Sequence, residues 1–307
     1  MQNNSLKADA LLFLTAAIWG FAFVAQRVGM DYIGPFTYNG IRFALGSLSL
    51  LPLIYLSRRA GRQGGRSAPA GGKVLLYGGL MAGGALFLGA SLQQAGLVYT
   101  TAGNAGFITG LYVVLVPILG LFWKQRPGAG TWLGASLALV GLYLLSVTEQ
   151  FTMAFGDVLV LIGAFFWAGH VLLIGWLSPR MDALKLSAIQ FAVCAVLSLL
   201  TALLLETITL DSVLQATVPI LYGGLMSVGV AYTLQVVAQR DAHPAHTAIL
   251  LSLEGVFAAI GGWLLLGETL GPRALLGCAL MLSGMLLSEL SAYLFRPRAC
   301  RSQEANS

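Results

Sequence analysis

Hydrophobic residues in this chain form a series of continuous runs, each close to the roughly 20 residues that an α-helix needs to cross a bilayer. Polar and charged residues gather in the segments between the runs. The runs lack the alternation of polar and apolar side chains that marks the strands of a membrane β-barrel. The pattern therefore predicts an all-α integral membrane protein with ten transmembrane helices. Their expected ranges are 10–29, 36–56, 74–97, 101–123, 131–147, 157–177, 184–205, 217–238, 245–266 and 274–295.

The sequence of the first five runs resembles that of the last five. The pentapeptide Tyr-Gly-Gly-Leu-Met stands at residues 77–81 and again at residues 222–226. Other residues recur at similar spacing: Asp9 corresponds to Asp157, Trp19 to Trp167, Arg42 to Gln190, Gly134 to Gly277 and Gly141 to Gly284. We therefore expect one five-helix repeat at residues 9–147, a second at residues 157–291, and a basic cytoplasmic tail at residues 292–307.

An odd number of crossings in each repeat has a consequence for topology. A unit of five helices enters the membrane from opposite sides in its two copies, so the repeats are expected to be inverted. Inverted repeats are typical of secondary transporters. The sequence thus favours a transport function before any site residue is considered.

Composition and charge agree with this interpretation. Hydrophobic residues make up 57% of the chain and charged residues only 9%, against about 25% charged residues in soluble domains. Fourteen Lys and Arg residues fall on one side of the predicted topology, and Arg27 and Arg273 on the other. By the positive-inside rule, both termini are then cytoplasmic. The net charge of +5 is a signal of topology, and we expect no nucleic-acid partner.

Several classes of site have no sequence signal. Gly72-Lys73 is followed by Val74, so no nucleotide-binding P-loop is present, and no metalloprotease or serine-hydrolase motif occurs. The three cysteines, Cys194, Cys278 and Cys300, have no paired spacing that would indicate a disulfide framework or a zinc site. We therefore expect no catalytic residues, no metal and no cofactor.

Polar residues inside the apolar runs are the best candidates for a substrate cavity, because their burial in lipid is costly. Glu254 lies near the middle of its run, where a buried carboxyl group can carry a coupling proton or can simply bond a neighbouring helix. Arg42 can contact an anionic substrate or form a structural pair. Trp19 and Trp167 correspond in the two repeats and can line a cavity or pack as ordinary aromatic residues.

His170 lies three residues after Trp167, on the same helix face, and can relay protons or pack in the core. Glu254 and His170 are the candidates for proton coupling. The remaining candidates for the cavity lining are Asn104, Tyr112 and Gln190, and further polar lining is expected from Gln93, Gln94, Tyr99, Gln235 and Gln239.

Several short motifs together resemble one known family. They are Ala17-Ile18-Trp19-Gly20, Arg42-Phe43, Thr109-Gly110-Leu111-Tyr112 with Pro117, Leu250-Leu251-Ser252-Leu253-Glu254 and Leu266-Gly267-Glu268. In this combination they resemble the EamA-type transporters of the drug/metabolite transporter superfamily. That family often has proline directly after this glutamate, where this chain has Gly255.

The resemblance implies a multi-pass carrier in the inner membrane, with a cavity between its repeats. It also implies export of small metabolites, often amino acids, by alternating access. The expected partners are a small-molecule substrate and the lipid bilayer, and the sequence leaves homodimer formation open. A non-transporting membrane protein, either an intramembrane enzyme or a scaffold for partners, is the alternative.

Overall fold

The computed structural model describes residues 2–59, 72–123, 128–146, 153–240 and 244–294. Over these ranges the chain consists of helices and short connections, without β-strands. The predicted all-α class is therefore confirmed. Most of the basic 57–73 connection and nearly all of the predicted tail lie outside the described residues, as do Lys124, Arg126 and Cys300.

The predicted apolar ranges fall on helical segments. In the first half these are α1 (Gln2–Gly29), α2 (Pro35–Arg59), α3 (Gly72–Leu97), α4 (Ala102–Gly110), α5 (Tyr112–Gly120), η1 (Leu121–Trp123) and α6 (Ala129–Ser146). In the second half they are α7 (Phe155–Leu177), η2 (Ser178–Arg180), α8 (Ala183–Leu205), α9 (Leu210–Gln215), α10 (Thr217–Leu221), η3 (Tyr222–Tyr232), α11 (Thr233–Ala238), α12 (Pro244–Ser252), α13 (Glu254–Gly261), η4 (Gly262–Leu266) and α14 (Pro272–Leu294).

Length and composition identify seven membrane-spanning candidates within the described parts of the chain. They are Leu6–Gly29, Pro35–Ser57, Gly72–Leu97, Ala102–Gly120, Phe155–Arg180, Ala183–Leu205 and Thr217–Ala238. Two further apolar helical stretches, Trp132–Leu145 and Leu250–Leu266, are shorter. That the chain crosses the membrane ten times remains a prediction.

The distribution of side chains differs from that in a soluble protein, because the surface is apolar and polar groups lie within an otherwise apolar interior. Large apolar side chains cover the outside, and both Phe122 and Leu204 are 83% exposed. Polar side chains occupy the interior, where Gln94 and Gln190 are fully buried and Arg42 is only 2% exposed. This arrangement suits a bundle that is surrounded by lipid and places its polar groups against protein.

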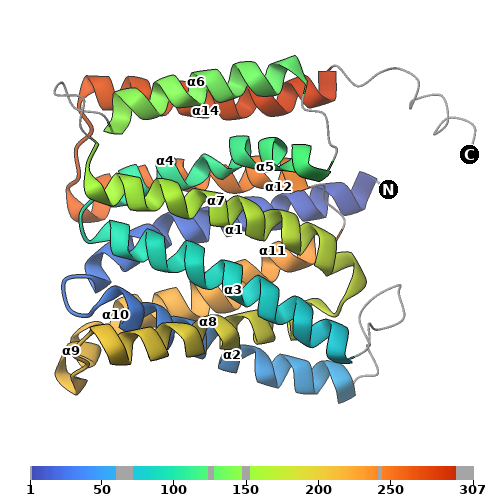
Figure 1. Ribbon diagram of the computed structural model, residues 1–307, viewed down its shortest axis with the longest axis vertical. Helices are drawn as coiled ribbons and strands as arrows, with labels where there is room; N and C mark the ends of the chain where they lie inside the picture. Colours follow the sequence, from blue (N-terminus) through green and yellow to red (C-terminus); the bar gives the residue numbers. More distant parts are fainter. Residues whose placement is uncertain (1, 60–71, 124–127, 147–152, 241–243, 295–307) are drawn as a thin grey trace, which may run out of the picture.

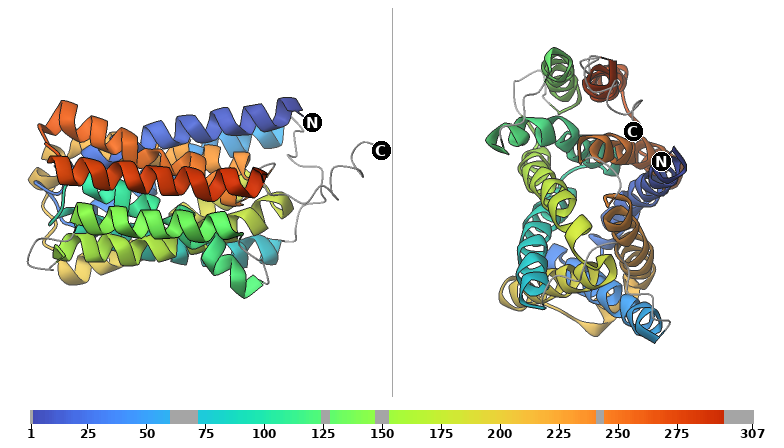
Figure 2. Two further views of the ribbon diagram at one scale, coloured as in Figure 1. Left: turned by 90° about the horizontal axis from the view of Figure 1, so that it is seen from above. Right: turned by 90° about the vertical axis from the view of Figure 1, so that its right-hand side faces the viewer.

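The helices lie side by side along a common direction (Figure 1). The start of α1 and the end of α14 lie at one end of this bundle, and α9 lies at the opposite end (Figures 1 and 2). We call the end that carries α9 the distal end. The starts of α2 and α4 also lie there (Figure 1).

Helices of the two halves approach closely at glycines. A Cβ atom on Gly83 of α3 would lie 2.6 Å from Cβ of Val193 in α8. At the edge of the bundle α6 and α14 pack along each other (Figure 1). A Cβ on Gly141 would lie 2.5 Å from the carbonyl oxygen of Gly277, and one on Gly284 would lie 2.4 Å from that of Gly134. Small residues permit this approach of backbones, as is usual between membrane helices.

Candidate functional site

A cavity lies at the centre of the bundle, between helices of both halves. Its lining consists of Trp19, Phe23 and Gln26 from α1, Arg42 from α2, Gln93 from α3, Thr109 from α4, Tyr112 from α5, Trp167, His170 and Val171 from α7, Ser227 and Tyr232 from η3, Gln235 from α11, Leu251 from α12 and Glu254 from α13. Six of the eight side chains singled out in the sequence therefore meet in one place. The cavity combines aromatic faces with one guanidinium and one carboxyl group.

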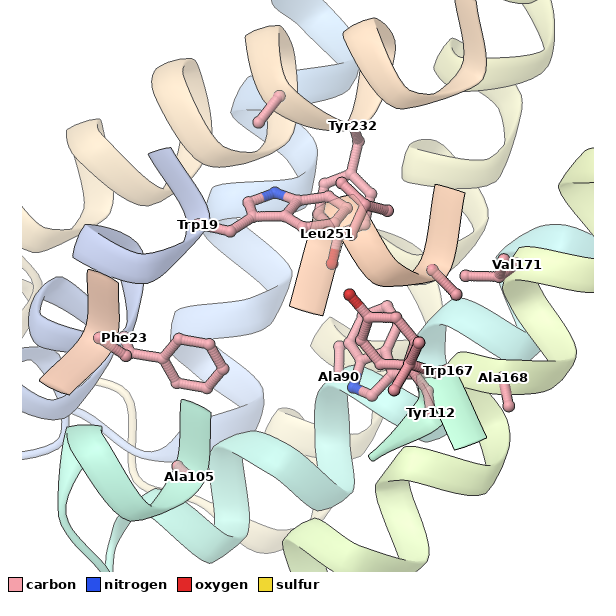
Figure 3. Close-up of a cluster of buried hydrophobic side chains, with 14 of the residues drawn as sticks. Trp19, Phe23, Ala90, Ala105, Tyr112, Trp167, Ala168, Val171, Tyr232 and Leu251 are labelled. Carbon is pink, nitrogen blue, oxygen red and sulfur yellow. The ribbon is translucent and has the colours of Figure 1, made fainter. Parts of the chain in front are cut away.

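Tyr232 is the centre of the aromatic wall. Its ring centroid lies 4.5 Å from that of Trp19 and 6.1 Å from that of Trp167, with which it is nearly parallel at 27°. The two tryptophans that correspond in the sequence repeat thus contact the same tyrosine. Figure 3 shows these side chains together, with the hydroxyl groups of Tyr232 and Tyr112 pointing into the same space. Such faces can stack against a planar or apolar ligand.

Arg42 is held in place by neutral groups. Its Nε donates a hydrogen bond of 2.9 Å to Oδ1 of Asn39, and Asn39 in turn donates to the carbonyl oxygen of Ala90 at 3.1 Å. The guanidinium carbon lies 4.8 Å from the ring centroid of Phe43 and 5.4 Å from that of Tyr38. Across the described ranges, no carboxylate lies within ion-pair distance of Arg42. The structural ion pair that the sequence left open for Arg42 is thus not present among the described residues, and Arg42 lines the cavity.

Glu254 and Tyr112 face each other from two interrupted helices. Leu111 alone separates α4 from α5, and Leu253 alone separates α12 from α13. Tyr112 and Glu254 are the first residues after these two interruptions, and the Tyr112 hydroxyl lies beside the Glu254 carboxyl group. That hydroxyl and Oε1 of Glu254 are both buried without a hydrogen bond of ordinary geometry to the described residues. Each group is therefore the polar neighbour of the other at the cavity.

His170 is oriented by a partner behind the cavity wall. Its Nε2 lies 2.9 Å from Oε1 of Gln190, which is fully buried in α8. The His170 ring packs edge-on against Trp167 and Tyr232, with centroid distances of 6.1 and 6.4 Å. Gln190 does not line the cavity, so it contributes by positioning His170.

Other expected lining residues lie elsewhere. Asn104 is half-buried in the first turn of α4 and does not reach the cavity. The Gln94 and Gln239 side chains bond backbone carbonyl groups, those of Gln26 and Val171. Tyr99 is 61% exposed. Of the five additional polar residues, only Gln93 and Gln235 line the cavity. Bonds to backbone carbonyl groups hold Gln94 and Gln239 away from the cavity, and Tyr99 lies at the surface.

Several lining residues were not predicted from the sequence, and Tyr232 is the most important of them. A phenol group in the middle of an apolar run was an available signal, the same one that pointed to Tyr112. Thr109 belongs to the same motif as Tyr112, and Ser227 accepts a 3.2 Å hydrogen bond from Nε1 of Trp19 through its backbone carbonyl. On the Ser227 side this contact uses the backbone carbonyl, so the identity of the Ser227 side chain could not have indicated it.

The cavity has a volume of about 30 Å³, and a water molecule needs roughly 10–15 Å³ measured in the same way. It therefore has room for about two water molecules. A metabolite of amino-acid size would require the walls to separate. Within the described ranges, no group of three His, Cys, Asp or Glu side chains is placed to hold a metal ion.

Comparison with known proteins gives a consistent result. The chain matches the EamA-like transporter family over residues 6–147 and 154–290. A protein of Archaeoglobus fulgidus described as an uncharacterized transporter is 33% identical over 290 residues, which cover 93% of this chain and 86% of the relative. The uncharacterized inner membrane transporter YedA of Escherichia coli K12 is 25% identical over 92% of this chain and 91% of its own length.

A crystal structure of a protein at 19% sequence identity aligns with a TM-score of 0.66, covering 94% of this chain and 99% of its own. This likeness concerns the fold alone. The family match extends over most of the sequence, and the apolar helices are long enough to span a membrane. The chain therefore belongs to the EamA-like transporter family and is a multi-pass membrane transporter.

Proposed function

We propose that this protein is a secondary transporter that exports small metabolites, with amino acids or related carboxylates as the favoured class, across the inner membrane by alternating access. The observation that carries this proposal is the central cavity. It brings a guanidinium group, a carboxyl group and two tryptophans together inside an apolar bundle. Burying these groups inside a membrane bundle is costly, and polar residues kept at such a cost commonly serve a function.

The charge pattern of the cavity fits a zwitterion with an apolar or aromatic side chain. The Arg42 guanidinium lacks a carboxylate partner in the described residues and can bind a substrate carboxylate with two hydrogen bonds. Glu254 can accept a substrate ammonium group or carry a coupling proton. The faces of Trp19, Trp167 and Tyr232 supply stacking surfaces for the rest of the ligand.

The packing of α6 against α14 supports two inverted repeats, at residues 9–147 and 157–291. Gly141 meets Gly277, and Gly134 meets Gly284, whereas the sequence repeat pairs Gly134 with Gly277 and Gly141 with Gly284. Each contact is therefore the symmetry mate of the other, as a two-fold axis between the helices requires. Because the sum of the residue numbers is the same for both contacts, the helices are antiparallel. Such an axis is perpendicular to them and lies in the membrane plane.

The interruptions at Leu111 and Leu253 support the same arrangement. They occupy matching places in the two repeats, to within one residue, and each is followed by a side chain that lines the cavity. Interrupted helices that meet at a repeat interface commonly form substrate sites in secondary transporters. Because the cavity is too small for a metabolite, its opening to one side at a time is part of the proposal.

An intramembrane enzyme or a partner-binding scaffold is the competing function. A scaffold gives no reason for an enclosed arginine and glutamate, and an enzyme needs a reactive group with an activating partner. His170 is the nearest candidate for such a group, and it bonds the neutral amide of Gln190. The cavity therefore favours transport over either alternative.

Transport by purified protein in proteoliposomes tests the proposal. Vesicles loaded with a mixed metabolite pool should release a subset of carboxylates, read by mass spectrometry. Arg42→Gln should weaken transport of those carboxylates about tenfold or more, because it removes charged hydrogen bonds, and should affect the corresponding amides less. Arg273→Gln, which changes an exposed cation outside the cavity, is the control. Release no faster than from protein-free vesicles, for every metabolite, would refute transport.

A further inference from the structure

Two glutamates at the distal end bind helix starts that belong to the other half of the chain. The first is Glu206, which follows α8. Its Oε1 accepts a 2.8 Å hydrogen bond from the backbone N–H of Phe36, and its Oε2 accepts bonds from the N–H and the hydroxyl of Thr37 at 2.8 and 2.6 Å. Gly34 makes room for this contact, because a Cβ there would lie 2.2 Å from Cδ of Glu206.

The second is Glu268, which follows η4. Its two carboxylate oxygens accept hydrogen bonds from the backbone N–H groups of Ala102 and Gly103, at 2.8 and 3.1 Å. Gly267 has a φ angle of +66°, a left-handed conformation that glycine adopts without strain. The resulting turn directs Glu268 back towards α4. A Cβ on Gly262 would lie 2.3 Å from Oε2 of Glu268, so this carboxylate also rests on a glycine.

The two contacts have the same arrangement. Each places a carboxylate on the first N–H groups of a helix, where unpaired donors and the helix dipole favour a negative charge. Each joins the second half of the chain to the first. Both carboxylates are half-buried, and Glu268 also borders a surface depression of about 570 Å³ with Arg27, Asp31 and Tyr99. Water can therefore compete for them when the contact loosens.

The two helices whose starts are bound, α2 and α4, also carry residues that line the cavity. Arg42 lies six residues after Phe36 on α2, and Thr109 lies seven residues after Ala102 on α4. At 1.5 Å per residue, the contacts are roughly 9–11 Å along the helix from the lining. A movement of either helix start would therefore move the cavity wall.

We propose that Glu206 and Glu268 are two latches that hold the distal side of the transport path closed, and that each transport cycle breaks and remakes both. This inference rests on the proposed alternating-access function. It states that the distal side is closed, that Glu206 and Glu268 close it, and that movement of the starts of α2 and α4 away from these glutamates opens it. In particular, it gives the Leu266-Gly267-Glu268 motif a gating role.

Accessibility of a cavity cysteine tests the latches without any transported substrate. Ser227 lines the cavity and is 2% exposed, so Ser227→Cys in a cysteine-free background reports opening. A membrane-impermeant maleimide is applied to right-side-out and to inside-out vesicles. Glu206→Gln with Glu268→Gln should raise labelling about tenfold or more from the face that carries α9, because charge-assisted bonds at both helix starts are weakened. Labelling from the opposite face should fall.

Asp211→Asn is the matched control, because this exposed carboxylate at the same end bonds only Gln215 of its own helix among the contacts described. It should leave labelling unchanged. Gly34→Ala and Gly262→Ala provide independent variants, since each places a methyl group where a latch carboxylate now lies. Gly34→Ala should raise labelling as much as Glu206→Gln does, and the two substitutions together should raise it no further. The same relation should hold between Gly262→Ala and Glu268→Gln.

Unchanged labelling from the α9 face, in variants that elute as a single folded species, would overturn the latch proposal even if transport is demonstrated. Additive effects of Gly34→Ala and Glu206→Gln would overturn it for that latch. Increased labelling in a protein that moves no metabolite would show that the two carboxylates hold the distal side of the cavity closed, but it would refute transport and therefore the breaking of the latches in a transport cycle. The two ideas can therefore fail separately.

Discussion

Within the described residues, no carboxylate neutralises the charge of Arg42, and one carboxyl oxygen of Glu254 lacks an ordinary hydrogen bond. The guanidinium is fixed through Asn39 and the aromatic rings of Tyr38 and Phe43, none of which neutralises its charge. Oε1 of Glu254 is buried without an ordinary hydrogen bond to the described residues. Buried polar atoms in native proteins are nearly always satisfied. Unpaired buried atoms also occur away from the cavity in the described residues, for example at Ser91 and Ser198. The case for a ligand or proton at Glu254 therefore rests on its place in a cavity shared with Arg42 and the aromatic wall.

Replacing Glu254 by Gln separates the two roles of this residue. The substitution keeps the shape and removes titration. If Glu254 carries the coupling proton, accumulation driven by a pH gradient should disappear while substrate exchange survives. If Glu254 instead binds a substrate ammonium group, exchange should weaken about tenfold or more at every pH.

Proteoliposome transport with and without an imposed pH gradient distinguishes these results, with Asp211→Asn as the control. Unchanged accumulation and unchanged exchange in Glu254→Gln would remove Glu254 from both roles. His170 would then be the next candidate for proton coupling.

The sequence could predict polar candidates but not which face of each helix they occupy. Trp19, Arg42, Trp167 and Glu254 were found because each is costly to bury in lipid, and all four line the cavity. Tyr232 was missed, although it lies among both tryptophans. Helices that are apolar on every side give no periodic signal for the inward face. Only the packed structure shows which polar side chains point to the centre.

Helices were easier to predict than their interruptions. Long apolar runs specify helices strongly, and the predicted ranges agree with the observed segments. The interrupting residues Leu111 and Leu253 give no signal themselves, because leucine is a good helix former. Gly110 and Pro117 mark the predicted helix at residues 101–123 as irregular, but they do not specify a break at Leu111. The short helix α9 was also missed, although Thr209 provides an N-cap through a 3.2 Å hydrogen bond from the N–H of Ser212. Six residues are too few to give a periodic pattern.

Two adjacent glycines in α3 test the packing of that element. Gly83→Ala would place a methyl group 2.6 Å from Cβ of Val193 in α8 and 2.9 Å from the carbonyl oxygen of Gln190. Overpacking of this kind costs about 1–3 kcal/mol. Gly84→Ala meets no atom within 4 Å and should be tolerated. Thermal unfolding of both variants in detergent should show a lower midpoint for Gly83→Ala only. Equal midpoints would contradict the observed contact between α3 and α8.

At the scale of the whole molecule, the distribution of charged residues predicts which end of the bundle faces the outside of the cell. The start of α1, the end of α2 and the start of α3, which carry Lys7, Arg59 and Lys73, lie at one end of the bundle, whereas α9, which carries Asp211, lies at the distal end (Figure 1). Glu206 and Glu268 bind the starts of α2 and α4 at that distal end. The positive-inside rule then assigns the distal end to the outside of the cell. The latched side of the proposed carrier would be its outer side, with export completed when both latches open.

Labelling of single cysteines checks this orientation. Arg180→Cys and Asp211→Cys, each in a cysteine-free background, replace exposed residues at opposite ends of the bundle. We expect an impermeant maleimide to label Asp211→Cys in intact spheroplasts and to reach Arg180→Cys only after permeabilisation. The expectation follows from fourteen basic residues on the Arg180 side and two on the other. The reverse pattern would place the latches on the cytoplasmic face, and labelling of both sites from outside would contradict a fixed topology. In either case the assignment of export to latch opening would have to be abandoned.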